Sequence, residues 1–337
     1  CKYTAFLWDC YKFSVNLPTE YYCHTMSITI IIPVYNRADL VKATLQSVAE
    51  QTVRPLQLIL VDNNSTDSTL ATLQQFQAEH QASDFSITVL QEATPGAAAA
   101  RNCGLRAATS EWVMFFDSDD TMAPDLVETY AKAIADNPLA DIIISKASLI
   151  ALDGNESTLP FFTSDAFANH LIHTIMSTTR YIARRTYFTN AGGWDESQTC
   201  WNDYELGVRL LLQMPTLAFI SDKPRIFVHA TEQSITGTDY SSRHKACEYA
   251  LDTITRNIEA SQHLQRERLL KIVDYRRVVL AALYAHEGHQ ELARPLYGKV
   301  IRQYVSSPVL STLFAIAYSY ISHGGRGFGR LIRLLIR

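Results

Sequence analysis

Three carboxylates crowd the end of one apolar segment, EWVMFFDSDD, which runs from Glu111 to Asp120. Asp117 and Asp119 stand two residues apart where a buried strand is expected to end, so extended backbone would point both side chains the same way. Carboxylates this close repel each other unless a cation joins them, and their oxygens suit Mg2+ or Mn2+. The pattern predicts a metal ion at Asp117 and Asp119, with Asp120 in a turn or helix cap.

A second acid, Asp62, ends another apolar segment. The polar run after it consists of Asn63, Asn64, Ser65, Thr66 and Asp67. Asn and Asp favour turns and helix caps, which explains most of that run. Two interpretations of Asp62 itself are about evenly balanced, a structural acid or an acceptor of hydrogen bonds from a nucleotide base or ribose. Arg101, which follows the small residues PGAAAA, is predicted to bind phosphate or Asp117.

The segments that must position these residues alternate between short apolar runs and longer helical ones, which predicts an α/β fold with a mostly parallel sheet. The expected strands are 27–34, 56–62, 85–91, 112–117 and 141–145, and the expected helices are 38–50, 67–80, 97–108, 124–137 and 202–213. Asn36 is the expected N-cap of the first helix. Polar or turn-rich motifs follow four consecutive strands. Because open α/β sheets bind ligands at the carboxyl ends of their strands, these motifs predict one shared site.

Composition excludes several other classes of protein. The 337 residues are 47% hydrophobic and 19% charged, as in folded globular chains. A net charge of -4 without a basic arm gives no case for nucleic-acid binding. Six cysteines without CxxC spacing predict neither a zinc site nor a disulfide framework and favour the cytoplasm. Residues 1–26 lack the apolar core of a signal, and we expect Met26 to be the natural start after an extension.

In order, the motifs resemble those of the inverting family-2 glycosyltransferases of the GT-A fold. The match runs from Ser27 to His229 through IIPVYNR, VDNNSTD, PGAAAARNCG, FFDSDD, GGWDES and WNDYE. This resemblance implies a mostly parallel central sheet flanked by helices, with a C-terminal helical region. It also implies a nucleotide-diphospho-sugar donor, with a UDP-sugar favoured, and Mn2+ or Mg2+ as cofactor.

The resemblance assigns the donor site residue by residue. Around the base and ribose it places Pro33, Val34, Tyr35 and Asp62. Asp117 and Asp119 form the DxD pair, with Asp119 the more direct metal ligand, and Arg101 contributes to donor binding. The family often has a second acid after the second strand, where this chain has Asn63. His229, at the end of a later strand, is a minor candidate for contact with the metal or diphosphate.

The catalytic base is expected in WNDYE, where the family's acidic pair corresponds to Asn202 and Asp203. Asp203 would take the proton from the acceptor hydroxyl. A simple helix-start charge is the alternative for this residue. For contact with the donor sugar or acceptor, the candidates are Gly193, Trp194, Asp195 and Trp201. Trp194 is equally suited to the core, and a buried structural role is favoured for Trp201.

The expected domains are the extension 1–26, a catalytic domain 27–238 and a C-terminal helical region 239–337 with a basic tail. No acidic residue follows Glu291, and the arginines of the tail at helical spacing are Arg326, Arg330, Arg333 and Arg337. One interpretation of the tail is peripheral contact with an anionic inner membrane. The other, which we favour, is a terminal helix packed on the catalytic domain. The apolar run Val309 to Ile321 is too short and interrupted to span a membrane.

The sequence thus predicts a metal-dependent inverting glycosyltransferase in the cytoplasm or on the inner face of the membrane. Its acceptor would be a saccharide or a lipid-linked molecule in surface polysaccharide assembly. A catalytically silent nucleotide-sugar-binding partner of another transferase remains an alternative. A nucleotidyltransferase on a similar sheet is a third hypothesis, but a Gly-rich phosphate loop would be expected where this chain has PVYNR.

Overall fold

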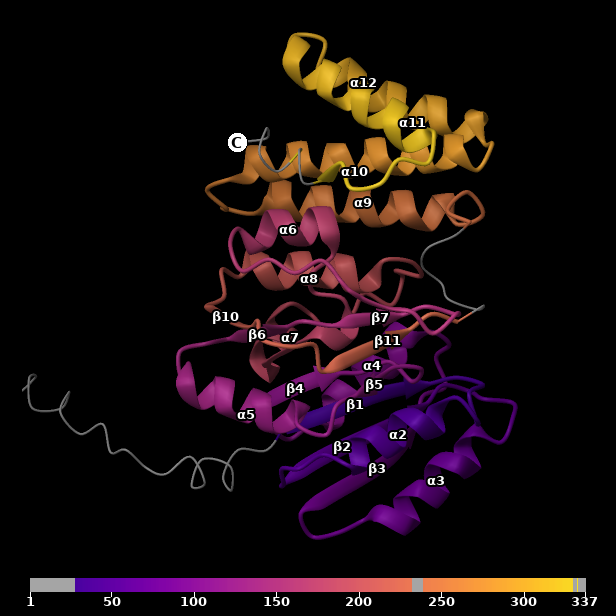
Figure 1. Ribbon diagram of the computed structural model, residues 1–337, viewed down its shortest axis with the longest axis vertical. Coiled ribbons are helices and arrows are strands. Elements are labelled where there is room, and N and C mark those ends of the chain that lie inside the picture. The colour runs from indigo at the N-terminus through magenta and orange to yellow at the C-terminus, as the bar shows by residue number, and fades with distance from the viewer. Residues whose placement is uncertain (1–27, 232–238, 330–331, 333–337) are drawn as a thin grey trace, which may run out of the picture.

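The computed structural model describes residues 28–231, 239–329 and 332. Figure 1 shows two parts along the long axis of the molecule, a sheet region at the bottom and a stack of helices at the top. The extension 1–26, with the expected start at Met26, lies outside the described residues. So do three arginines of the basic tail, Arg330, Arg333 and Arg337.

A seven-stranded sheet forms the centre, with the strand order β10-β6-β9-β4-β1-β2-β3. Its strands are β1 (Ile28–Val34), β2 (Leu56–Asp62), β3 (Phe85–Gln91), β4 (Trp112–Phe115), β6 (Ile142–Ser145), β9 (Tyr181–Arg184) and β10 (Leu217–Ile220). Only β9 is antiparallel to its neighbours. Every residue of β1 is buried, as expected for a parallel strand covered on both faces. The predicted mostly parallel α/β sheet is confirmed.

Helices cover both faces of this sheet. On one face lie α2 (Val41–Ala49), α3 (Thr69–His80) and α5 (Leu126–Asp136), and on the other lie α4 (Ala97–Ala107), α6 (Ala166–His173) and α8 (Asn202–Leu212). A Cβ on Gly104 of α4 would lie 2.4 Å from Cγ2 of Ile31, so this glycine lets the helix approach β1 closely. Asn36 is not the cap of α2, because the helix begins at Val41 and Leu40 is its N-cap.

A four-stranded sheet stands beside the central one. It contains β5 (Thr121–Met122), β11 (Ile226–His229), β7 (Ser148–Ile150) and β8 (Glu156–Thr158), in the order β5-β11-β7-β8. β5 follows Asp120 directly and pairs antiparallel with β11. The pairing therefore brings the acidic loop after β4 next to His229. The short elements η1 (Thr178–Arg180) and α7 (Arg185–Asn190) flank β9.

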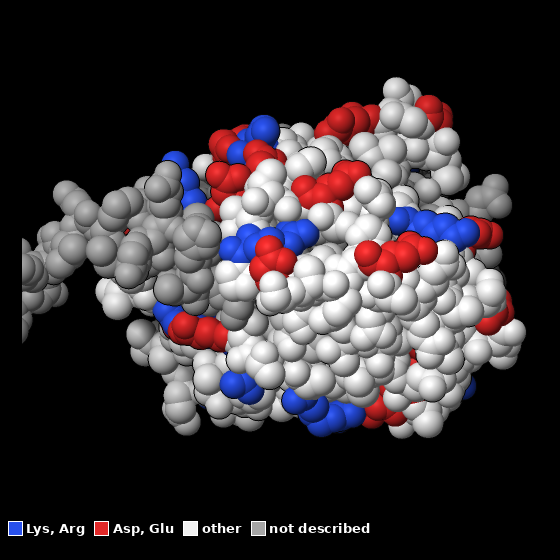
Figure 2. All heavy atoms as spheres, turned by 90° about the horizontal axis from the view of Figure 1, so that it is seen from below, with Lys and Arg blue, Asp and Glu red and all other residues white. Residues whose placement is uncertain are grey.

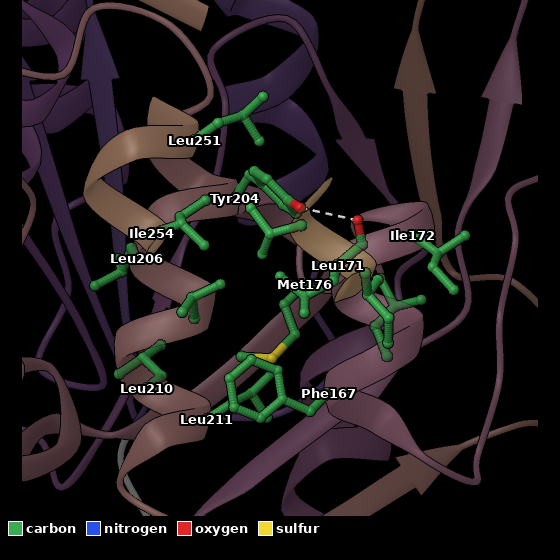
Figure 3. Close-up of a cluster of buried hydrophobic side chains, with 14 of the residues drawn as sticks. Phe167, Leu171, Ile172, Met176, Tyr204, Leu206, Leu210, Leu211, Leu251 and Ile254 are labelled. Atoms are coloured by element: carbon green, nitrogen blue, oxygen red, sulfur yellow. Dashed lines mark hydrogen bonds between the residues drawn. The ribbon is translucent and has the colours of Figure 1, made fainter. Parts of the chain in front are cut away.

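The C-terminal region is helical, as predicted. It comprises α9 (His244–Ala260), α10 (Arg266–His286), α11 (Gln290–Gln303) and α12 (Pro308–Ser322). Its core is continuous with that of α6 and α8, and Figure 3 shows Ile254 of α9 beside Leu206 of α8. The hydroxyl of Tyr204 donates to the carbonyl of Leu171 at 2.9 Å, drawn as the dashed line in Figure 3. The predicted domain division near residue 238 remains a prediction.

The described part of the tail folds back onto α6. Phe328 packs against the core, and Ile332 is 0% exposed. Gly329 lies so close to Ile172 that a Cβ there would be 2.5 Å from Cγ2 of that residue. These contacts support the interpretation of the tail as a packed terminal segment. In the part of the chain that the structure describes, no helix is both long and apolar enough to cross a membrane.

Candidate active site

Two arginines hold the acids that follow β4. Arg101 of α4 donates from Nη2 to Oδ1 of Asp117 at 2.7 Å. Arg37, in the loop after β1, donates from Nη1 to Oδ2 of Asp119 at 2.7 Å. The side chains of Asp117 and Asp119 are 34% and 20% exposed. The strand ends at Phe115, so a loop rather than extended backbone positions both carboxylates at the carboxyl end of the sheet.

Asp120 lies beneath this pair. Its N–H donates to the carbonyl of Asp117 at 3.3 Å, which is the predicted turn, but α5 is capped by Asp125 and not by Asp120. The carboxyl of Asp120 is buried and accepts the N–H of His229 at 3.2 Å. Burial raises its pKa well above the ordinary value, and the charges of Asp117 and Asp119 raise it further. Three acids are therefore in electrostatic contact at the site.

The donor set at this place suits a hard cation only in part. Asp117 and Asp119 offer partly exposed carboxylate oxygens, which could bind Mg2+ or Mn2+ if substrate oxygens and water completed the coordination. Nε2 of His229 forms a hydrogen bond with the hydroxyl of Thr121 at 2.9 Å, so its predicted role as a metal ligand has no support in its contacts. Among residues 28–231 and 239–329, no three His, Cys, Asp or Glu side chains form a group that could hold a metal ion.

Asp62 presents an unsatisfied oxygen. The residue is 1% exposed, and its Oδ2 accepts the N–H of Ser65 at 3.4 Å. Oδ1 is buried without a hydrogen-bond partner among the described residues. Since an unpaired buried carboxylate oxygen is costly, this geometry favours the ligand-binding interpretation of Asp62. Val34 is its register partner in β1, and Tyr35, the next residue, is 56% exposed.

Asn63 has a structural task that an ionised acid could not perform. Its Nδ2 donates to the carbonyls of Glu92 and Thr94 at 3.0 and 2.7 Å, and its Oδ1 accepts the N–H of Gly96 at 2.7 Å. A carboxylate has no donor for the two carbonyls. The amide at this position therefore fixes the loop between β3 and α4, which explains why a second acid is missing.

Asp203 lies in the first turn of α8 and is half-buried. Its Oδ1 accepts the N–H of Tyr204 at 2.8 Å. Burial raises the pKa of Asp203, the Tyr204 N–H and the Arg101 charge offset part of that rise, and the Asp117 charge adds to it. The carboxylate is therefore a stronger proton acceptor than an exposed Asp. It also lies within electrostatic reach of the arginine that binds Asp117.

Glu205, two residues further along α8, is a structural acid. It is 1% exposed and receives two hydrogen bonds from Arg209, at 2.7 and 2.6 Å. Nδ2 of Asn257 adds a third from α9 at 3.1 Å. Glu205 therefore ties the start of α8 to the C-terminal helices.

The GGW motif, Gly192 to Trp194, packs against residues that position the site. Trp194 is 2% exposed, and its ring packs edge-on against Phe115, with 5.1 Å between the ring centroids. The guanidinium carbon of Arg101 lies 4.4 Å from the centroid of the same ring. This burial and packing favour the interpretation of Trp194 as a core anchor, and its contact with a sugar stays a prediction.

Asn102 clamps this motif. It accepts the N–H of Trp194 at 2.8 Å and donates to the carbonyl of the same residue at 2.9 Å. Gly193 has φ +72°, and a Cβ there would lie 2.6 Å from Oδ1 of Asn102. The positive φ and the close contact with Asn102 restrict the position to glycine. Gly193 therefore has a conformational role, and its predicted place near the sugar stays a prediction.

Asp195 and Trp201 lie nearer the surface. Oδ1 of Asp195 accepts the N–H and hydroxyl of Ser197 at 2.9 and 2.6 Å, which closes a turn. Trp201 is half-buried, and its ring lies 6.2 Å from that of Tyr240 and 5.4 Å from the guanidinium of Arg276. Part of the indole remains open to solvent. Contact of either residue with a sugar or acceptor stays a prediction.

Arg37 is the site residue that the sequence did not single out. It stands in PVYNR after the first strand, but neither its spacing nor its neighbours indicated that it would reach Asp119. Its N–H also donates to Oγ1 of Thr69 at 2.8 Å, which fixes the loop against α3.

Comparison with known proteins agrees with this fold. Residues 29–186, slightly less than half of the chain, match the family described as Glycosyl transferase family 2, and this segment belongs to that family. An uncharacterized glycosyltransferase of Haemophilus influenzae is 24% identical over 242 residues, which are 70% of this chain and 80% of that protein. Further curated relatives match over 31% to 48% of this chain, and the match spans 16% to 44% of their own length.

Two solved structures show the same fold. TarS of S. aureus, residues 1–349 in complex with UDP-GlcNAc, superposes with a TM-score of 0.66 at 19% identity, covering 92% of each chain. The mannosyltransferase PcManGT of Pyrobaculum calidifontis, in complex with GDP-Man and Mn2+, gives a TM-score of 0.53 at 19% identity, covering 88% of this chain and 87% of the other. At such identities the likeness establishes the GT-A fold.

Proposed function

We propose that this chain transfers a sugar, with inversion, from a nucleotide-diphospho-sugar to a saccharide or lipid-linked acceptor in surface polysaccharide assembly. A UDP-sugar is the favoured donor, because the similar TarS structure contains UDP-GlcNAc. The observation that carries the proposal is Asp203, a half-buried carboxylate with a raised pKa in electrostatic contact with Arg101 and Asp117. Inverting transfer requires a single base on the face of the sugar opposite the leaving diphosphate.

The donor would bind along the carboxyl ends of β1, β2 and β4. The unpaired Oδ1 of Asp62 would accept a hydrogen bond from the base or ribose, beside Pro33, Val34 and Tyr35. Arg101 has buried Nε and Nη1 atoms without a hydrogen-bond partner in the described chain. Because guanidinium groups bind phosphate oxygens strongly, these atoms suit the diphosphate.

Asp117 and Asp119 would hold Mn2+ or Mg2+, with the diphosphate supplying further oxygens. When bound, the ion would neutralise charge that develops on the leaving diphosphate. Each acid now binds an arginine, so Arg37 and Arg101 hold both carboxylates in position before the donor arrives. The Mn2+ in the similar PcManGT structure is consistent with this assignment.

In the transfer step, Asp203 accepts the proton of an acceptor hydroxyl while the oxygen of that hydroxyl attacks the anomeric carbon of the donor sugar. The bond between that carbon and the diphosphate oxygen breaks, and the nucleoside diphosphate leaves with the electron pair. Attack on the face opposite the diphosphate inverts the anomeric configuration. Trp201, which is half-buried and two residues before Asp203, would contact the acceptor.

A cytoplasmic or peripheral membrane location also belongs to this proposal. The apolar tail residues Phe328 and Ile332 do not supply the membrane contact, because they pack into the protein. The alternative of a silent nucleotide-sugar-binding partner would keep the Asp62 pocket but would need no base at Asp203.

A donor screen tests the function directly. UDP- and GDP-sugars are tested for thermal stabilisation of the full chain with Mn2+ and then with EDTA, since a bound donor raises the unfolding midpoint. We expect a UDP-sugar to stabilise the chain only with the metal, and the product from a α-linked donor to be β-linked. Retention of configuration would refute the inverting assignment. Donor binding without transfer or donor hydrolysis across a broad acceptor panel would favour the silent partner.

A further inference from the structure

The outermost helix, α12, presents an apolar face to solvent. Its residues Pro308–Ser322 include no Asp, Glu, Lys or Arg. Phe314 and Ala317 on its inner side are buried, whereas Val309 and Ile316 are 76% and 53% exposed. Exposed helices ordinarily carry charged residues on the outer side. An uncharged outer side therefore indicates a surface that contacts something other than water.

The exposed residues form one stripe, which we call the α12 face: Val309, Thr312, Ile316 and Tyr320. Their spacings of three and four residues place them on the same side of the helix. Val305, just before the helix, is 73% exposed, and Tyr320 is 48% exposed. Figure 1 shows α12 at the top of the molecule, at the end opposite the central sheet.

All charged residues that follow Glu291 in the sequence, on either side of the α12 face, are basic. No acidic residue follows Glu291, and exposed cations occur on both sides of α12: Arg294, Lys299 and Arg302 on α11 and Arg326 beyond the helix. The hydroxyl of Tyr320 donates to the carbonyl of Arg326 at 3.0 Å, so a basic residue adjoins the stripe at its end. Figure 2 shows the opposite end of the molecule, where basic and acidic side chains are interspersed.

We propose that the α12 face docks on an anionic lipid surface. Val309 and Ile316 would enter the boundary between headgroups and acyl chains, and Tyr320 suits that interface. Arg302 and Arg326 would lie among anionic headgroups. A second copy of the chain is a poorer occupant, because in a two-fold pair the same cationic border would meet itself. Phe328 of the tail lies against Tyr320 at one end of this face, with 6.0 Å between the ring centroids, and Ile332 packs on the core, while Val309 and Ile316 stay 76% and 53% exposed.

Vesicle sedimentation with the full chain tests this proposal. Vesicles of equal parts phosphatidylglycerol and phosphatidylcholine should bind the protein, vesicles of phosphatidylcholine alone should bind it weakly, and added salt should weaken the first interaction. Val309→Asp combined with Ile316→Asp should weaken binding more than about tenfold, because two apolar anchors are replaced by charges that anionic lipid repels. Arg326→Gln should weaken it about fivefold.

The matched control places the same charges on exposed leucines of the sheet region. Leu139 and Leu152 are 82% and 70% exposed, and Leu139→Asp with Leu152→Asp should leave vesicle binding unchanged. Thermal unfolding of every variant checks that the fold persists. Equal binding to both vesicle types, or full binding by the Val309 and Ile316 double variant, would overturn the proposal. So would a dimer in sedimentation velocity that this double variant dissociates, with no binding to vesicles.

Discussion

The acids after β4 form ion pairs with arginines, whereas the acid at the start of α8 does not. Asp117 and Asp119 each form an ion pair of 2.7 Å, with Arg101 and Arg37. Asp203 forms no ion pair with any described residue, and burial raises its pKa. Direct pairing holds a carboxylate in one position, which suits an ion site, whereas burial without a pair raises the proton affinity of a carboxylate. The same residue type is thus prepared for two tasks by its neighbours.

Glu205 sharpens the contrast within one helix. It lies two residues after Asp203 and is buried, but Arg209 and Asn257 occupy its oxygens. Its contacts serve the packing of α8 against α9. Position in the motif therefore does not decide which acid is the base, whereas the availability of the carboxylate oxygens does.

Removing an acid of the ion-paired region should have the largest effect. We expect Asp119→Asn to lower transfer about a thousandfold, because the carboxylate that would hold the metal loses its charge. Donor binding by calorimetry should then become insensitive to Mn2+. The control is Asp39→Asn. The side chain of Asp39, in the segment after β1, is 92% exposed, and this variant should remain active. Full activity of Asp119→Asn would contradict the metal assignment.

A change at Glu205 tests whether the neighbouring acid is structural. Glu205→Gln leaves Arg209 without its charged partner, and we expect a loss of about 3 kcal/mol in the free energy of unfolding, measured by denaturant titration. Transfer by the folded fraction at low temperature should change little. If transfer vanished while stability persisted, Glu205 rather than Asp203 would be the base.

The pH dependence tests the contact between the two regions. Arg101 lowers the pKa of Asp203, so Arg101→Met should raise that pKa. Because the base must be ionised, the acidic limb of the kcat/KM profile should move upward by about one pH unit. Arg101→Lys, which keeps the positive charge, should move it less. An unmoved limb in both variants would show that Arg101 does not act on the base.

The smallest effect concerns stability at the base. The folded-state pKa of Asp203 is raised, so its ionised form destabilises the fold above the unfolded pKa. Asp203→Asn removes this cost and should raise the free energy of unfolding at neutral pH by about 1 kcal/mol. The gain should disappear below about pH 4, where the wild-type carboxyl is protonated in both states. Differential scanning calorimetry across this pH range would show whether it does.

Sequence alone predicted the frame of the site well. Apolar runs ending in polar motifs identified β1, β2, β3 and β4; β1, β2 and β4 are almost wholly buried, and the edge strand β3 is partly buried. Contacts made across the fold could not be predicted in this way. Arg37 reaches Asp119 across 82 positions in the chain, and Asn63 fixes a loop near Gly96.

Burial was the other quantity that the sequence left undecided. Trp194 suited a sugar or the core equally, and only its packing on Phe115 and Arg101 favours the core. The tail was similar, because the fold-back that buries Ile332 depends on the surface offered by α6. Residue type predicts chemistry, but exposure depends on every element packed nearby.

The central claim is that Asp203 accepts the proton of the acceptor. Single-turnover transfer by Asp203→Asn at saturating donor, with donor affinity measured by calorimetry, tests it most directly. Transfer by Asp203→Asn should fall about a thousandfold or more relative to the control variant Asp39→Asn. Donor affinity should change little, since the amide fills the same space as the carboxylate without its basicity. Transfer at the wild-type rate with unchanged donor affinity would contradict the assignment.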